Sequence, residues 1–132
     1  MQILNVNTIL CQVEDMDRAV AFYRDTLGLQ PGNVSPYWSD FQLGGITIGL
    51  HPPMRGSSPP YAVPLKGWIL GVQTDDLAEL RARLTATGAV INGDYHDVPG
   101  GVVLDFADPD GNAIEAIQTG ATAAGLAASV QP

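Results

Sequence analysis

The sequence has few basic residues, and this shortage excludes several classes of partner. Lys and Arg together number 6 against 14 Asp and Glu, which gives a formal net charge of −8. A chain of this charge repels phosphate backbones and anionic lipid surfaces, and it contains no local cluster of basic residues to oppose the repulsion. We therefore expect neither nucleic acid nor a membrane surface as a partner.

Cysteine and long apolar segments are scarce as well. Cys11 is the only cysteine, so the chain forms no internal disulfide and no site with several cysteine ligands. No stretch approaches the roughly 18 apolar residues of a membrane-spanning helix. The first ten residues, MQILNVNTIL, lack the basic lead and long apolar run of a secretion signal. A cytoplasmic protein is the simplest expectation.

What the sequence does contain is an internal repeat of about 60 residues. In each half, a strand rich in β-compatible residues runs into a helix with apolar residues at three- and four-residue steps, which ends at Gly28 or Gly88. Three short extended segments follow each helix: 29 to 35, 38 to 43 and 46 to 51, then 90 to 97, 101 to 107 and 113 to 117. The pattern predicts two βαβββ units.

A proline-rich stretch separates the two halves. Residues 52 to 66, PPMRGSSPPYAVPLK, hold five prolines and show little periodicity, which is typical of a stiff connector. With 45% hydrophobic residues, a chain of this length is expected to form one domain over residues 1 to 132. Its predicted parts are a first module over about 5 to 52, the connector at 53 to 66, a second module over about 67 to 118, and a tail at 119 to 132 that forms either a short docked helix or a frayed end.

Two motifs of this repeat resemble one known family. VEDMDRAVAFYRDTLGL is an acid-led helix that ends in Leu-Gly, and FADPDGNAIEAIQ contains an Asp-Pro-Asp-Gly turn. Over about residues 5 to 118 the chain resembles the vicinal oxygen chelate superfamily of glyoxalases, bleomycin resistance proteins and extradiol dioxygenases. The resemblance implies an α+β fold in which two βαβββ modules form a cupped mixed sheet with helices on its outer face. It fixes no activity, because the superfamily spans isomerases, epimerases, dioxygenases, thiol transferases and non-catalytic drug binders.

Alternation along each strand predicts which side chains face the concave side of this sheet. Apolar side chains at every second position mark the helix-facing side, which leaves the intervening residues for the concave side. The polar and aromatic residues of that set are predicted to bind ligand: Gln12, Trp38, Asp40, His51, Asp105 and Glu115. The same rule predicts that the following residues pack beneath helices: Phe41, Leu43, Trp68, Leu70 and Val72.

The resemblance also implies where a metal would be held. Members that use a metal have four concave ligands, one from the first and one from the last strand of each half, and the matching positions here are Thr8, Gly49, Gly67 and Glu115. Only Glu115 is a credible ligand, because threonine is a poor partner for Zn²⁺ or Fe²⁺ and glycine has no side chain. We therefore predict no metal or other cofactor. The alternative is a divalent metal held by His51 and Glu115, although two protein ligands seldom hold such an ion firmly.

Two functions are compatible with these residues. The first is a metal-independent small-molecule-binding protein of the glyoxalase/bleomycin resistance type, which sequesters a drug or a metabolite and so serves antibiotic resistance. The second is a small lyase, isomerase or related enzyme in which Glu115 is the candidate catalytic base or shares a metal with His51. The sequence leaves catalysis and ligand identity open. We also expect a homodimer, because the sheet edges of the two halves need cover.

Overall fold

The computed structural model describes residues 1–53, 67–107, 109 and 111–129. The first half contains β1 (Ile3–Gln12), α1 (Met16–Ala21), the π-helix η1 (Phe22–Thr26), β2 (Pro31–Val34), β3 (Ser39–Leu43) and β4 (Ile46–His51). The second half contains β5 (Gly67–Thr74), α2 (Leu77–Thr87), β6 (Ile91–Val98), β7 (Gly101–Ala107) and β8 (Ala113–Thr119), and α3 (Ala123–Ser129) follows it. None of the described helices is long and apolar enough to cross a membrane.

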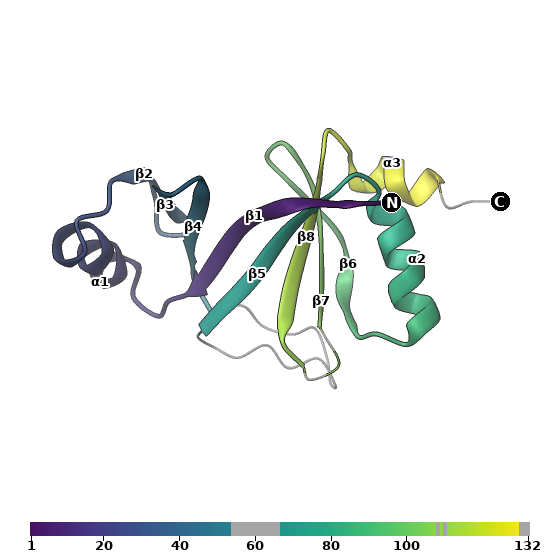
Figure 1. The fold of residues 1–132 in the computed structure, drawn as a ribbon, viewed down its shortest axis with the longest axis horizontal. Helices are drawn as coiled ribbons and strands as arrows, with labels where there is room; N and C mark the ends of the chain where they lie inside the picture. The colour runs from purple at the N-terminus through teal and green to yellow at the C-terminus, as the bar shows by residue number, and fades with distance from the viewer. Residues whose placement is uncertain (54–66, 108, 110, 130–132) are drawn as a thin grey trace.

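All of these strands belong to one mixed sheet with the order β2-β3-β4-β1-β5-β8-β7-β6. Within each half the first and last strands are parallel, β1 with β4 and β5 with β8. The halves join through β1 and β5, which run antiparallel at the centre of the sheet (Figure 1). This arrangement confirms the predicted α+β fold of two βαβββ units, and it leaves β2 and β6 as the sheet edges.

An acidic cap begins each of the two main helices. The Asp15 carboxylate accepts a hydrogen bond from the backbone N–H of Arg18, and the Asp76 carboxylate accepts one from Glu79, both at 3.0 Å. The two caps lie 61 positions apart (76 − 15). The first helix is shorter than predicted, because the backbone widens into η1 after Ala21. Within η1, Tyr23 packs on Phe41 with ring centroids 5.9 Å apart.

Removing the cap of α2 should weaken the fold. Asp76→Ala leaves the backbone N–H of Glu79 without its side-chain acceptor, so we expect the free energy of unfolding to fall by about 1 kcal/mol. Urea unfolding followed by circular dichroism measures the change. Asp76→Asn, which keeps an acceptor oxygen at the cap, should recover most of the loss, and equal losses in both variants would contradict this role.

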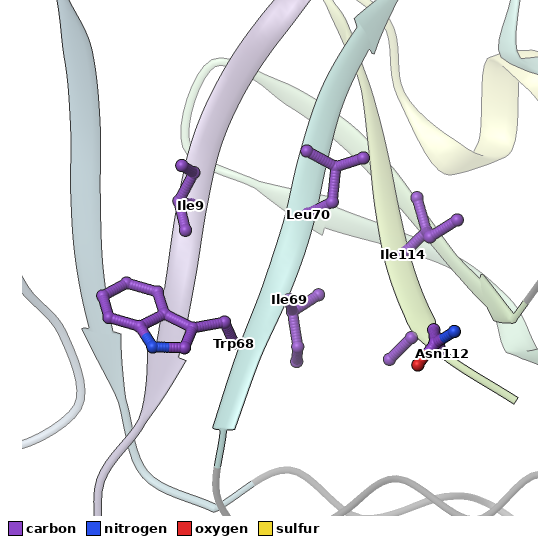
Figure 2. A pocket seen from close by; sticks show the side chains of 7 residues that line it. Ile9, Trp68, Ile69, Leu70, Asn112 and Ile114 are labelled. Atoms are coloured by element: carbon purple, nitrogen blue, oxygen red, sulfur yellow. The ribbon is translucent and has the colours of Figure 1, made fainter.

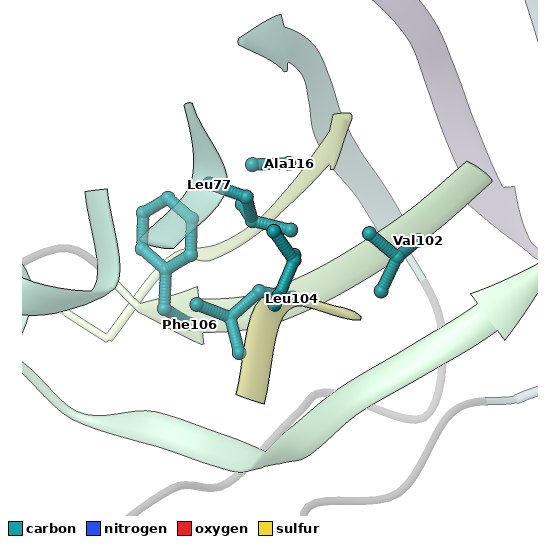
Figure 3. Close-up of a cluster of buried hydrophobic side chains, with 6 residues drawn as sticks. Leu77, Val102, Leu104, Phe106 and Ala116 are labelled. Atoms are coloured by element: carbon teal, nitrogen blue, oxygen red, sulfur yellow. The ribbon is translucent and has the colours of Figure 1, made fainter. Parts of the chain in front are cut away.

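Two clusters of buried side chains fix the helices to the same face of the sheet. α1 packs through Val20 on Phe41 and Leu50 of the first half. In the second half α2 and α3 cover β7 and β8, with this buried set: Leu77, Val102, Leu104, Phe106, Ala116 and Leu126 (Figure 3). Leu126 belongs to α3, so the first of the two alternatives for the C-terminal tail, a docked helix, holds for residues 123–129.

Three residues predicted to pack beneath helices are instead exposed. Leu43, Trp68 and Leu70 show 53%, 54% and 43% of their surface to solvent. The phase of their strands was predicted correctly, since Phe41 is buried and Val72 packs beside the second-half cluster. For Trp68 and Leu70 the prediction failed because α1 packs near β4 and α2 near β8, so that no described helix covers these two residues of β5. Leu43 is the last residue of β3, at the turn into β4. The predicted connector lies outside the described residues, apart from Pro53.

Candidate functional site

The face of the sheet opposite the helices carries a row of polar residues across its second half. Strand pairing places Glu115 of β8 between Gly71 of β5 and Asp105 of β7. Asn92 of β6 extends the row beyond Asp105, and Thr8 of β1 extends it beyond Gly71. Glu115 and Asp105 are neighbours of the buried Ala116 and Leu104, so their side chains leave the helix-facing core and point to the concave side.

The two carboxyl groups share a hydrogen bond and interact strongly. Burial, together with the charge of Asp105 and the shared hydrogen bond, raises the pKa of Glu115 to about 8. Burial also raises the pKa of Asp105, although the hydrogen bond from Glu115 and the charges of His96 and His51 act in the opposite direction. Because the two groups are buried side by side, each opposes the ionisation of the other, and Glu115 is the member whose pKa reaches the neutral range.

Beside this carboxyl pair the concave face is apolar. Leu10 of β1 and Ile69 of β5 face each other across the central strand pair, and each is only 2% exposed. Trp38, Ala107 and Ala113 complete the contacts around them. The middle of the concave face is thus a hydrophobic floor, which the polar row borders on one side.

Trp38 lies over this floor in a fixed position. Its indole ring covers Gly49 of β4, and a Cβ atom built at Gly49 would overlap the ring. The indole Nε1–H donates to the Asp40 carboxylate at 2.6 Å. Asn33 also donates to this carboxylate, from its backbone N–H at 2.9 Å and from its side chain at 3.0 Å. Asp40 is therefore the acceptor that orients the Trp38 ring.

These contacts also set the charge of Asp40. Burial acts to raise the pKa of Asp40, but the hydrogen bonds from Asn33 and Trp38 outweigh that effect and hold the pKa below its usual range. Asp40 is 8% exposed, and its oxygens are engaged by protein donors. Its observed contacts are with Trp38 and Asn33, and a direct contact with ligand stays a prediction.

Gln12 and His51 form a third part of the concave face. They are paired across β1 and β4, next to the Leu10 and Gly49 pair. Gln12 is buried, and His51 is half-buried with its Nδ1 donating to the Pro52 carbonyl at 2.7 Å. Nδ1 is thus engaged with the backbone, and Nε2 is the ring nitrogen of His51 that takes no part in this bond.

The residues at the metal positions do not fit a divalent metal. The 61-residue spacing of the helix caps makes Ile69, not Gly67, the counterpart of Thr8, but neither residue supplies a ligand for such an ion. At Gly49 the Trp38 ring fills the space beside the backbone. Glu115 alone remains, and the described part of the chain holds no group of three or more His, Cys, Asp or Glu side chains that suits a metal.

Sequence reasoning found most of this face but missed its internal contacts. It did not identify Asn33 as a partner of Asp40. It placed Leu10 and Ile69 on the concave side but predicted a polar groove there, not an apolar floor. A signal for the Trp38 contact was present, because a glycine at an inward position of a strand often marks close approach of another group. Asp105 and Glu115 were both predicted as ligand-binding residues, and only the pairing of β7 with β8 shows that they touch.

Comparisons with known proteins agree with this architecture. A model of the Glyoxalase/Bleomycin resistance protein/Dioxygenase superfamily matches residues 5–116. Methylmalonyl-CoA epimerase from Mycobacterium tuberculosis has a similar structure, with a TM-score of 0.68, 18% identity, and coverage of 89% of each chain. A Mn(II)-bound glyoxalase from Novosphingobium aromaticivorans aligns with a TM-score of 0.65 and 21% identity over 89% of this chain and 39% of that one.

A third solved structure is described as an NAD-dependent benzaldehyde dehydrogenase from Legionella pneumophila. It aligns with a TM-score of 0.63 and 19% identity over 86% of this chain and 98% of that chain. A search of curated proteins gives no match. At identities this low, the structural likeness shows the fold alone, because one fold serves many activities.

Proposed function

Because this chain belongs to the Glyoxalase/Bleomycin resistance protein/Dioxygenase superfamily, we propose that it is a metal-independent small-molecule-binding protein. It holds its ligand on the concave face and acts by sequestering a drug or a metabolite. One observation carries this proposal: the Trp38 ring covers Gly49, where a metal-ligating side chain would have to stand. Sequestration requires a shaped surface and a few polar anchors but no metal ion.

The concave face offers two kinds of contact to a ligand. Trp38 and the floor beneath it favour a planar or sugar-bearing group, since an aromatic ring fixed by a hydrogen bond is a rigid stacking surface. The Asp105 and Glu115 pair supplies two buried carboxyl groups, and the pKa of Glu115 lies near 8. A cationic or hydroxyl-rich compound matches this pair, and Gln12 and His51 are the remaining polar groups that we assign to ligand binding.

A second function is favoured by the state of Glu115. A carboxyl group with a pKa of about 8 exchanges its proton readily near neutral pH, which is what general acid–base catalysis requires. Proton transfer by Glu115 would make the protein a small isomerase or lyase. The similar structures include a methylmalonyl-CoA epimerase, but the likeness extends only to the fold.

Metal analysis and ligand screening test the first function together. We expect protein purified without added metal to contain Zn, Fe, Mn and Ni far below one ion per chain, and we expect its melting temperature to rise with compounds from a panel of antibiotics, glycosides and thiol conjugates. A ligand at 100 times its Kd adds roughly 2.7 kcal/mol to stability. Stoichiometric metal, removed by chelation with loss of the ligand-induced shift, would overturn metal independence.

The proposal keeps two further predictions from the sequence, a homodimer and a cytoplasmic location. The reason for the homodimer is narrower than expected, however. β1 and β5 cover each other within the chain, so the sheet edges that a partner would cover are those of β2 and β6.

A further inference from the structure

The edge strand β6 contains a bulge between Asn92 and His96. Asn92 pairs with Asp105. His96 pairs with Val103, so residues 93–95 face only the single residue between Val103 and Asp105. The first of them, a glycine, has a φ of 78°, in the left-handed region that favours glycine. Bulges are common at sheet edges and beside functional sites, where they re-aim a side chain, and here the bulge sets which face of the sheet His96 occupies.

His96 lies on the concave side of the sheet. The residue before it, Tyr95, packs against the buried cluster beneath α2 and α3. The residue after it, Asp97, accepts a hydrogen bond from the first backbone N–H of α3 at 2.8 Å, so both neighbours face the helices. Side chains alternate along a strand, and His96 therefore points away from the helices, toward the side that holds Asp105 and Glu115.

His96 and Asp105 are diagonal neighbours on this face. Val103, the partner of His96, precedes Asp105 by two residues on β7, and side chains in such a diagonal relation are within reach of each other when they are long. Burial raises the pKa of Asp105, and the charge of His96 acts against this effect. His96 is exposed, whereas Asp105 and Glu115 are partly buried. Polar side chains thus run from the rim of the face at β6 to its interior at β8.

These side chains offer a ligand both kinds of hydrogen-bonding group. An imidazole carries an N–H donor in each of its protonation states, and carboxyl oxygens accept. A hydroxyl group donates and accepts at one oxygen, so neighbouring hydroxyl groups of a sugar can bond to His96 and to Asp105 together. An ammonium group only donates, so it can use the carboxyl groups but not the N–H of His96.

The burial of the carboxyl pair also favours a neutral ligand over a cation. Burial raises the pKa of both groups, that of Glu115 to about 8, so the pair is not fully ionised at neutral pH. A cation therefore meets less negative charge than two carboxylates would supply, and moving it out of water is costly without that charge. A hydroxyl group bonds to a carboxyl group in either protonation state.

The apolar hollow elsewhere on the sheet offers such a ligand few partners. It has a volume of about 340 Å³ and lies beside the starts of β5 and β8. The residues around it include Ile9, Trp68, Leu70, Asn112 and Ile114 (Figure 2). Apart from the Asn112 amide and the Trp68 indole N–H, these side chains form no hydrogen bonds. Recognition of hydroxyl groups therefore falls to the polar residues of the concave face.

We propose that His96 is a further ligand-binding residue, and that with Asp105 and Glu115 it selects a neutral ligand that carries neighbouring hydroxyl groups, such as an aryl glycoside. His96 donates to one hydroxyl group at the rim, and the carboxyl pair bonds to the next ones inside. This inference rests on the proposed function, because it requires the ligand to lie on the concave face. It decides between the two ligand classes that match the carboxyl pair alone.

Isothermal titration calorimetry with para-nitrophenyl glucoside tests the role of His96. We expect the parent to bind this neutral probe and His96→Ala to bind it about threefold to tenfold more weakly, the effect of one lost hydrogen bond. His96→Asn keeps an N–H donor and should retain most of the affinity. Asp94→Asn is the matched control, because Asp94 lies on the same strand but pairs with Arg81 of α2, and it should bind as the parent does.

A charged analogue of the same probe tests the ligand class. Para-nitrophenyl glucosaminide with a free amino group replaces one hydroxyl group by an ammonium group and keeps the rest of the molecule. We expect the parent to bind it more weakly than the neutral glucoside at neutral pH. Tighter binding of the charged analogue, or an unchanged affinity for the neutral glucoside in a folded His96→Ala, would overturn the proposal.

The screen for the proposed function keeps the two proposals separable. A chain whose melting temperature rises with an antibiotic or a thiol conjugate, but which binds neither glycoside, would overturn the choice of ligand class and leave small-molecule binding in place. A chain that responds to no compound of the panel and to neither glycoside would overturn both proposals. Binding of the neutral glucoside that weakens in His96→Ala, and not in Asp94→Asn, supports both.

Discussion

Glu115→Gln is expected to raise the free energy of unfolding by roughly 3 to 5 kcal/mol at pH 8 and to change it little at pH 4. The pKa of Glu115 is about 8 in the folded protein, against a model value of 4.5, because burial and the charge of Asp105 oppose ionisation. Below pH 4.5 Glu115 is protonated in both the folded and the unfolded chain, and its contribution to stability is then at its full value. As the pH rises toward 8, Glu115 loses its proton in the unfolded chain before it does so in the folded protein, so the unfolded state is favoured and this contribution is lost.

The glutamine side chain has no acidic proton to lose, so the variant should not show this decline. Urea unfolding at a series of pH values from 4 to 9 measures the difference between parent and variant. Glu14→Gln, at an exposed position before α1, is the matched control and should follow the pH curve of the parent. Parallel pH curves for the parent and Glu115→Gln would show that Glu115 is not held in its protonated form.

The same variant separates the two proposed functions. Glutamine keeps the shape of the side chain but can neither ionise nor transfer a proton. Under the binding function, a cationic ligand should bind the parent more tightly as the pH rises through about 8, and Glu115→Gln should remove this pH dependence. Turnover would disappear in the variant only if Glu115 is the catalytic acid or base.

Asp40→Ala is expected to lower the free energy of unfolding by about 2 to 3 kcal/mol. It leaves the Nε1–H of the half-buried Trp38 without its acceptor, and it removes two hydrogen bonds from Asn33. Because the pKa of Asp40 is below its usual range, its contribution is present above the unfolded pKa and is lost as the pH falls through the folded value. The parent and Asp40→Ala should therefore converge in stability in strong acid.

The Trp38 ring should also lose its fixed position in this variant. In a Trp68→Phe background, Asp40→Ala should shift the emission of Trp38 to longer wavelength and increase its quenching by iodide. Asp25→Ala, which breaks an exposed ion pair with Arg24, is the control and should leave both stability and emission close to the parent. Unchanged emission in Asp40→Ala would show that packing over Gly49, and not the hydrogen bond, holds the ring.

Strand and helix positions could be predicted from the sequence because their signals are local. Alternation along a strand needs only neighbouring residues, so Phe41, Leu104 and Ala116 were placed on the correct face. The helix caps at Asp15 and Asp76 and the repeat between them depend on a few adjacent residues in the same way. These features sufficed to predict two βαβββ units and the family resemblance.

The exposure of Trp68 and Leu70 could not be predicted in this manner. Their strand phase is correct, but burial also needs a helix above them, and α1 and α2 contact β4 and β8, the neighbours of the central pair, without covering these two residues. Whether a helix reaches the centre of the sheet depends on packing angles between elements far apart in the chain. Strand phase alone therefore predicted burial where the tertiary structure leaves an open face.

The sequence by itself determined the repeat, the strand faces and the absence of a full set of metal ligands. Only the tertiary structure decided which concave residues touch: Asp105 with Glu115 through the register of β7 and β8, and Trp38 with Gly49 through the pairing around β4. The physical reason is that a shift of register by one residue turns a side chain to the other face. Such registers are fixed by contacts across the whole sheet, which no local pattern encodes.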